Sequence, residues 1–199
     1  MSLETYSGLK ASVANWLNRT DLATEIPDFI ALVESRLAHE LRIPSIEKTA
    51  YIITDIHGRA TIPADFLEIK DVFFNDKPVD RVSLGFLTSQ TAGSGTPTIF
   101  AREANEFKFH PIPVISETAK LKVIYYYQVP ALSDSASTND LLKTVPELYL
   151  YGALSEAAKF LGADATRWET GYQTAYGRVV AHTRQAEVSG TTQLVLSGY

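Results

Sequence analysis

The last third of the chain holds a helical segment that carries apolar or small residues on nearly every side. It begins at Thr144 and ends at the helix-breaking Gly162, and Asp164 starts a second, longer helix that is expected to run to about Glu187. The apolar and small residues of the first helix are Leu148, Tyr149, Leu150, Tyr151, Ala153, Leu154, Ala157 and Ala158. A helix that is apolar on all sides has to be buried on all sides. Because one sheet and a few helices of a 199-residue chain can hardly cover it, the pattern predicts that another protein supplies the missing contacts.

Two shorter helices are expected near the N-terminus, where apolar residues recur at the spacing of one helix face. These residues are Tyr6, Leu9, Val13 and Trp16 or Leu17 in the first helix, and Ile26, Ile30, Val33, Leu37 and Leu41 in the second. Thr5 is a suitable N-cap for the first helix, and Pro44 prevents the second from extending much beyond Arg42. We interpret both stripes as core-facing.

Between residues 45 and 130 the hydrophobic period changes to two, which is typical of strands. The clearest candidates are residues 66–74, 106–110 and 121–129, and a hairpin is expected around the turn 55–58. The glycine-rich stretch 88–97 is expected to be a linker-like loop. Short connections favour a mainly antiparallel sheet, and helices that precede and follow the strands, without alternating with them, predict an α+β fold.

We therefore expect a single domain over residues 1–199. A helix pair from residues 1–43 and another from residues 144–187 would pack as a helical bundle. A mainly antiparallel β lobe of residues 45–130 would be inserted between the two pairs, and residues 188–199 would form a flexible C-terminal tail.

The composition excludes several classes of protein. The net charge of −5 and the scattered Lys and Arg residues provide no basic surface for gripping DNA or anionic lipid. No apolar run approaches the roughly 18–20 residues that span a bilayer, so no membrane partner is expected. The N-terminus has neither the basic nor the apolar part of a secretory signal. There are no cysteines, so disulfides and thiolate metal sites are excluded.

A search for reactive groups identifies no catalytic, cofactor-binding or metal-binding set. The four histidines, His39, His57, His110 and His182, lack the spacing of a helical zinc site. The Asp55-x-His57-Gly58 sequence is typical of a turn, and the pair Glu34 and Glu40 lies on a helix expected to be solvated. We therefore predict that the chain is not an enzyme and uses no cofactor.

The C-terminal residues are better suited to contacts with partners. On the last helix, Trp168, Tyr172, Ala175, Val179, His182 and Ala186 form a narrow seam for another helix, and the preceding helix of the same chain is the favoured neighbour. Beyond it, Leu194, Val195 and Leu196 are a β-prone apolar trio that we expect to be donated to a partner's sheet. The candidate interface residues are Tyr149, Tyr151, Trp168, Tyr172, Val179, Leu194, Val195 and Leu196.

Several segments, taken in order, resemble the adaptor proteins that join the head to the tail in tailed bacteriophages. They are residues 5–18 and 26–37, Ile62-Pro-Ala-Asp-Phe-Leu-Glu68, Gly95-Thr-Pro97, Tyr125-Tyr-Tyr, Pro130-Ala-Leu-Ser-Asp134 and Pro146-Glu-Leu-Tyr-Leu-Tyr-Gly-Ala-Leu154. The resemblance covers almost the whole chain. It implies a homo-oligomeric ring of roughly twelve subunits, a dodecamer closed by rotation.

The same resemblance implies that the ring docks beneath the portal protein, receives a tail or nozzle protein on its other face, and lets DNA pass through its lumen without gripping it. The protein would be a virion component at the head–tail junction that is assembled in the cytoplasm of the bacterial host. Two alternatives remain open at this point. One is a carbohydrate- or ligand-binding module of a phage tail that uses Tyr125, Tyr126 and Tyr127, and the other is a cell-wall hydrolase that uses Glu34 or Glu40.

Overall fold

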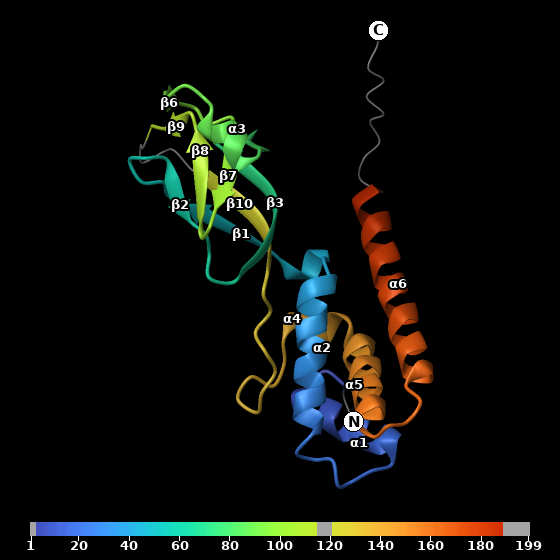
Figure 1. Cartoon of the computed structure of the whole chain (residues 1–199). Coiled ribbons are helices and arrows are strands. Elements are labelled where there is room, and N and C mark those ends of the chain that lie inside the picture. The colour runs from blue at the N-terminus through green and yellow to red at the C-terminus, as the bar shows by residue number, and fades with distance from the viewer. Residues whose placement is uncertain (1–2, 115–120, 189–199) are drawn as a thin grey trace. The chain divides into compact units, whose positions relative to one another are not determined.

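The computed structural model describes residues 3–114 and 121–188, which form helices together with antiparallel-dominated sheets. The contacts divide the chain into two units: Met1–Ile46 with Val129–Tyr199, here called the helical unit, and Glu47–Gln128, here called the β lobe. Both units are drawn in Figure 1. The prediction of an α+β fold is confirmed.

Both N-terminal helices of the helical unit form where the apolar stripes predict them. They are α1 (Tyr6–Leu17) and α2 (Ile26–Glu40), followed by the short 3-10 helix η1 (Pro44–Ile46). The Thr5 hydroxyl caps α1 by accepting a hydrogen bond from the Gly8 N–H at 3.2 Å. The predicted stripes face inward: the buried positions of the two helices are Tyr6, Leu9, Val13, Ile26, Phe29, Ile30, Val33 and Leu37.

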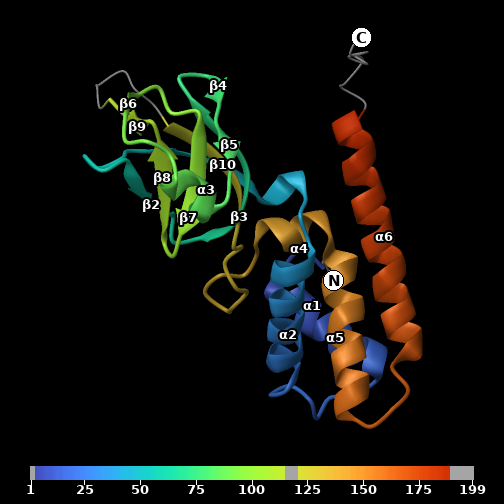
Figure 2. The same cartoon turned by 45° about the horizontal axis from the view of Figure 1, so that its top comes forward.

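Helix α5 is the centre of the helical unit. It spans Pro146–Phe160, between the short α4 (Asp140–Thr144) and the long α6 (Thr166–Val188). It packs against α1, α2, α4 and α6, and Figures 1 and 2 both show it running between α2 and α6. The prediction that another protein must cover this helix is wrong, because helices from both ends of the sequence converge on it. Its buried residues include Leu148, Tyr149, Leu150, Leu154, Ala157 and Ala158.

One glycine permits this packing. A Cβ atom placed on Gly152 of α5 would lie 2.7 Å from Cγ2 and 3.0 Å from Cγ1 of Val33 on α2. Real Cβ atoms do not approach carbon that closely, so any larger residue at this position forces the two helices apart. The absence of a side chain at Gly152 therefore sets the distance between α2 and α5.

A polar cluster joins α6 to α2 and α5. The guanidinium of Arg36 on α2 donates to both carboxylate oxygens of Glu169 on α6, at 2.7 and 3.1 Å, and lies 3.8 Å from the centre of the Tyr172 ring. Ser155 of α5 donates to the same carboxylate at 3.1 Å, and the Tyr172 hydroxyl donates to Glu40 at 3.2 Å. Hydrogen bonds from Arg36 lower the pKa of Glu169 to about 2. This bidentate pair holds the base of α6 against α2.

The β lobe contains two four-stranded sheets and a small two-stranded one. The strands are β1 (Glu47–Ile52), β2 (Arg59–Thr61), β3 (Phe66–Phe74), β4 (Lys77–Pro78), β5 (Asp80–Arg81), β6 (Ser94–Gly95), β7 (Ile99–Glu103), β8 (Glu106–His110), β9 (Ile112–Pro113) and β10 (Leu121–Tyr127), with helix α3 (Leu84–Thr88) after β5. Their orders are β1-β10-β3-β4, β2-β8-β7-β5 and β6-β9. Both larger sheets contribute to one core, in which Phe66 contacts Phe107 and Tyr125 through its ring.

The turn at residues 55–58 forms, but the expected hairpin does not. Asp55 accepts hydrogen bonds from the N–H groups of His57 and Arg59, and Gly58 has a φ of +72°. The flanking strands nevertheless belong to different sheets, since β1 pairs with β10 and β2 pairs with β8. The turn therefore carries the chain from one sheet to the other.

The glycine-rich segment is also more ordered than a linker. Ser94 and Gly95 form β6, which pairs in parallel with Ile112 and Pro113 of β9. The N–H of Ile112 also donates to the Gly93 carbonyl at 2.9 Å. The expectation of a linker-like loop over residues 88–97 is therefore wrong for residues 93–95, because backbone pairing fixes them on the lobe.

Replacement of Gly152 by alanine should destabilise the protein despite the higher helix propensity of alanine. The gain of about 1 kcal/mol in propensity is outweighed by the roughly 1–3 kcal/mol cost of overpacking against Val33. The matched control is Gly177→Ala on α6, where a new Cβ meets nothing within 4 Å. We expect a lower melting temperature for Gly152→Ala and an unchanged or higher one for Gly177→Ala in thermal denaturation. Equal shifts would contradict the packing argument.

The Arg36–Glu169 pair should make stability depend on pH in the acid range. The folded state lowers the pKa of Glu169 from its usual 4.5 to about 2, so its contribution is present above pH 4.5 and is lost as the pH falls towards 2. Because the carboxylate is partly exposed, Glu169→Gln should lower the free energy of unfolding by only about 1 kcal/mol at pH 7. The difference from wild type should shrink between pH 4.5 and pH 2 in denaturant titrations. Glu156→Gln, which alters a local pair with Lys159, should show little of this pH dependence.

Candidate docking surface

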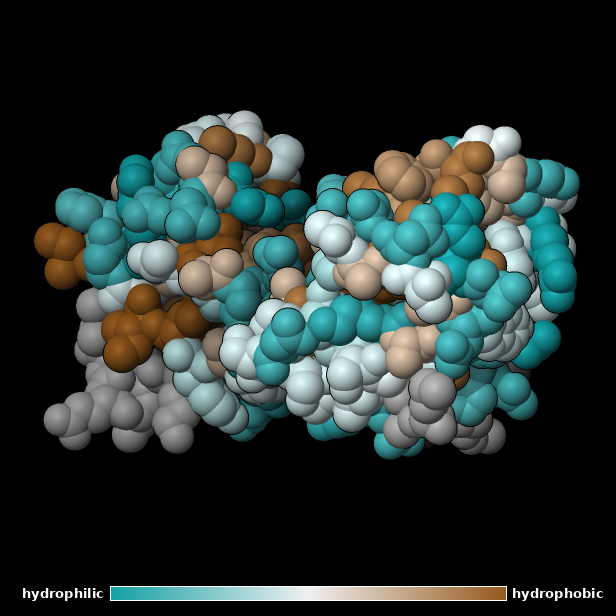
Figure 3. Space-filling model, turned by 90° about the horizontal axis from the view of Figure 1, so that it is seen from below, coloured by the Kyte–Doolittle hydropathy of each residue, from teal (hydrophilic) through white to brown (hydrophobic). Residues whose placement is uncertain are grey.

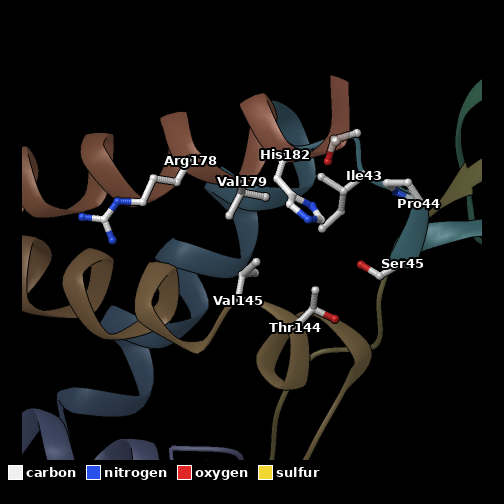
Figure 4. A pocket seen from close by; sticks show the side chains of 9 residues that line it. Ile43, Pro44, Ser45, Thr144, Val145, Arg178, Val179 and His182 are labelled. Atoms are coloured by element: carbon white, nitrogen blue, oxygen red, sulfur yellow. The ribbon is translucent and has the colours of Figure 1, made fainter. Parts of the chain in front are cut away.

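An apolar pocket lies within the helical unit, beside the second half of α6. Its volume is about 540 Å³. Its lining comes from η1 and the residue before it, from the end of α4, and from α6: Ile43, Pro44, Ser45, Thr144, Val145, Arg178, Val179, His182 and Thr183. Figure 4 shows Val179 and His182 on one side of the pocket and Val145 and Thr144 on the other. We call this cavity the α6 pocket.

The pocket exists because α6 is longer than the helix it packs on. Helix α6 has 23 residues and α5 has 15, and α6 runs back along α5 after the turn at Gly162. The second half of α6 therefore passes the start of α5 and faces η1 and α4. These two elements are short, so they leave a hollow next to α6.

The pocket is sparsely charged. The cationic side chain at its edge is Arg178, which is 70% exposed and 4.0 Å from Glu147. Inside, the Ser45 Oγ is buried and has no hydrogen-bond partner among the residues that the structure describes. A mostly apolar wall is suited to a short apolar segment.

A second surface feature is an aromatic cluster at the start of α6. The ring of Trp16 lies 5.7 Å from Trp168 and 6.0 Å from Tyr151 between centroids, and the guanidinium of Arg167 lies 4.6 Å from the Trp168 ring. Trp16 is 49% exposed. The Tyr151 ring also rests on Gly171, where a Cβ would lie 3.1 Å from its nearest atom. This aromatic cluster both joins α1, α5 and α6 and presents apolar area to the surface.

The predicted interface residues fall into separate places. Tyr149 and Tyr172 are only 1% and 0% exposed, so they pack inside the helical unit and offer no surface to a partner. Tyr151 and Trp168 belong to the aromatic cluster, and Val179 lines the α6 pocket. Leu194, Val195 and Leu196 lie outside the described residues. The seam of α6 packs partly on α5, which was the favoured neighbour.

Sequence reasoning missed most of the pocket. Ile43, Ser45, Thr144 and Val145 come from segments that the periodicity assigned to helix ends or connections. The available signal was the unequal length of the last two helices. The sequence also gave no indication that Arg36 and Glu169 form a pair, because a salt bridge between helices far apart in the chain leaves no local pattern.

The carboxylates considered for catalysis have structural contacts. Glu34 accepts a hydrogen bond from the Leu132 N–H at 2.9 Å, and burial raises its pKa. Glu40 contacts Arg36 and Tyr172. Among residues 3–114 and 121–188, no three His, Cys, Asp or Glu side chains are grouped as a metal site would require. Glu34 therefore connects α2 to the segment before α4, and Glu40 connects α2 to α6.

The tyrosines considered for carbohydrate stacking differ in exposure. Tyr125 is 1% exposed, and its hydroxyl donates to Asp65 at 2.9 Å. Burial and this hydrogen bond raise its pKa to about 12. Tyr126 and Tyr127 are half-buried on β10. The ring of Tyr125 belongs to the core of the β lobe and is not available for stacking on a sugar.

Apolar side chains are also exposed at separate places on the β lobe. Tyr51, Ile53 and Ile56 follow one another along and after β1, Phe86 lies on α3, and Val114 follows β9. The space-filling view in Figure 3 shows hydrophobic areas as islands among hydrophilic residues. In the described part of the chain, none of the helices combines the length and apolar character needed to cross a bilayer.

Truncation of Trp168 tests whether the aromatic cluster is mainly structural. Trp168→Ala should lower the free energy of unfolding by about 2 kcal/mol, less than the roughly 3–5 kcal/mol of a fully buried aromatic residue. Leu32→Ala is the control, because Leu32 is 54% exposed on α2 of the same unit. Chemical denaturation measures both changes. A Trp168 variant as stable as wild type would show that the ring serves a partner.

Comparison with known proteins agrees with the resemblance seen in the sequence. A search of curated proteins finds no match. A family model described as SU10 adaptor protein matches residues 4–194, which include the described parts of both the helical unit and the β lobe from Glu4 onward. This match confirms the resemblance to phage head-to-tail adaptors. The chain belongs to the SU10 adaptor protein family.

Proposed function

We propose that this protein is a structural virion component that forms a homo-oligomeric ring beneath the portal and connects the phage head to the tail. The observation that carries the proposal is the family match over residues 4–194, because it extends through both units and is not confined to one local motif. The ring would be a dodecamer, located at the head–tail junction and assembled in the host cytoplasm.

The physical features of the chain support such a role. The net charge of −5 is suited to a lumen through which DNA passes transiently without being held. The α6 pocket and the exposed part of the aromatic cluster provide apolar area for protein contacts on the helical unit. A tail or nozzle protein would bind the opposite face of the ring. The task is mechanical, so no catalytic group or cofactor takes part in it.

Assembly on the portal is the direct test. We expect the isolated chain to be monomeric or weakly associated at micromolar concentration, because its apolar surface is divided into small separate areas. Addition of the portal ring from the same phage should produce a complex with one closed adaptor ring, seen by native mass spectrometry and electron microscopy. Absence of binding to the portal would contradict the proposed function, whereas a stable ring without the portal would contradict only templating.

Removal of residues 191–199 should separate folding from assembly. Residues 191–199 follow a Ser-Gly pair in the sequence and contain one apolar trio, so we expect them to bury little within their own unit. We expect a nearly unchanged melting temperature and impaired docking or ring closure, measured by co-sedimentation with the portal. A melting temperature many degrees lower would assign the tail to the core of its own subunit, and normal assembly would show that the tail is dispensable.

A further inference from the structure

We propose that the α6 pocket of one subunit binds the Leu194-Val195-Leu196 segment of a second copy of this chain. The inference rests on the proposed ring, in which identical copies lie side by side. The contact between successive copies would join an acceptor pocket on the helical unit to a donor segment that follows α6 in sequence.

The pocket and the segment match in chemistry. The pocket walls are formed largely by Ile43, Pro44, Val145 and Val179. Residues 189–197 contain no ionisable side chain and have their apolar residues together at positions 194–196. An apolar cavity next to water favours an uncharged apolar occupant, and burying each such side chain is worth roughly 1.5–3 kcal/mol.

The lengths favour a second copy over the subunit's own tail. Helix α6 continues from Val179 to Val188, which carries the chain about 14 Å past the middle of the pocket at 1.5 Å per residue. The six Cα–Cα steps from Val188 to Leu194 span at most about 21 Å when fully extended. A return to the middle of the same pocket would use about two thirds of that length for the axial distance alone, and the reversal of direction would have to fit into the remainder. A neighbouring subunit imposes no such reversal.

Such an exchange is directional and repeats from subunit to subunit. The donor segment and the acceptor pocket are different surfaces of one chain, so the contact is heterologous and generates a ring when the rotation closes. Each subunit then gives one segment and receives one. The pocket is occupied only in the assembled state, and the neighbouring subunit supplies its cover.

Peptide binding tests the match without requiring a ring. The probe is a labelled peptide of residues 190–197, and the receptor is the chain truncated after Gly190, observed by fluorescence anisotropy. We expect saturable binding that is at least tenfold weaker in Val179→Arg, which places a charge in the pocket. Gln185→Arg is the matched control, because it adds the same charge at an exposed position of α6 outside the pocket lining. Absence of binding, or equal binding by the two variants at unchanged melting temperature, would overturn the proposal.

Crosslinking then shows whether the segment in the pocket comes from the same subunit or from a neighbouring copy. The chain contains no cysteine, so in the double variant Thr183→Cys/Ser197→Cys a disulfide between the pocket and the tail joins positions 183 and 197, and each single variant controls for disulfides between like positions. Oxidation of this variant bound to portal should give a ladder of covalent oligomers on a non-reducing gel. A crosslinked monomer alone, or no crosslink, would overturn the exchange.

If Val179→Arg still forms normal rings on the portal, the inference fails while the proposed function stands. If wild type forms no ring, the proposed function fails.

Discussion

Gly152 of α5 and Val33 of α2 approach so closely that a Cβ atom at Gly152 would clash with Val33, and the packing of α2 on the central helix relies on this approach. Because Gly152 has no side chain, α2 lies directly on α5. Arg36, three residues after Val33 on α2, makes the bidentate pair with Glu169 at the base of α6. The helix that lies directly on α5 at Gly152 therefore also carries an ion pair that connects residues 133 apart in the sequence.

The same arrangement explains why the docking features lie where they do. Helices from both ends of the sequence cover α5 so that Tyr149 is buried and Tyr151 is half-buried. Accessible apolar features include the aromatic cluster at the start of α6 and the α6 pocket along its second half. The long last helix therefore has two functions. Its first half completes the core, and its second half forms one wall of a surface cavity.

The β lobe has a separate core. Phe66, Phe107 and Tyr125 link its two larger sheets through ring contacts, and Asp65 accepts a hydrogen bond from the Tyr125 hydroxyl. The turn Asp55–Gly58 transfers the chain from one sheet to the other, so β1 and β2 belong to different sheets, whereas β3 with β4 and β7 with β8 pair within their own sheets. This arrangement buries the alternating aromatic residues from both sides.

The local structure could be predicted from the sequence alone. Stripes of apolar residues, together with Thr5, Pro44 and Gly162, located helices α1, α2, α5 and the start of α6, and a hydrophobic period of two located β3, β8 and β10, because these signals act over a few residues. The ordered set of family segments also indicated an adaptor. The three-dimensional packing was needed to show that α5 is covered by its own chain, that β1 pairs with β10, that Arg36 contacts Glu169, and that Val179 lines a pocket with Ile43 and Val145. Each of these features depends on contacts between residues far apart in the chain. Such contacts are set by the packing distance between elements and by helix length. They therefore leave no periodic pattern in the sequence.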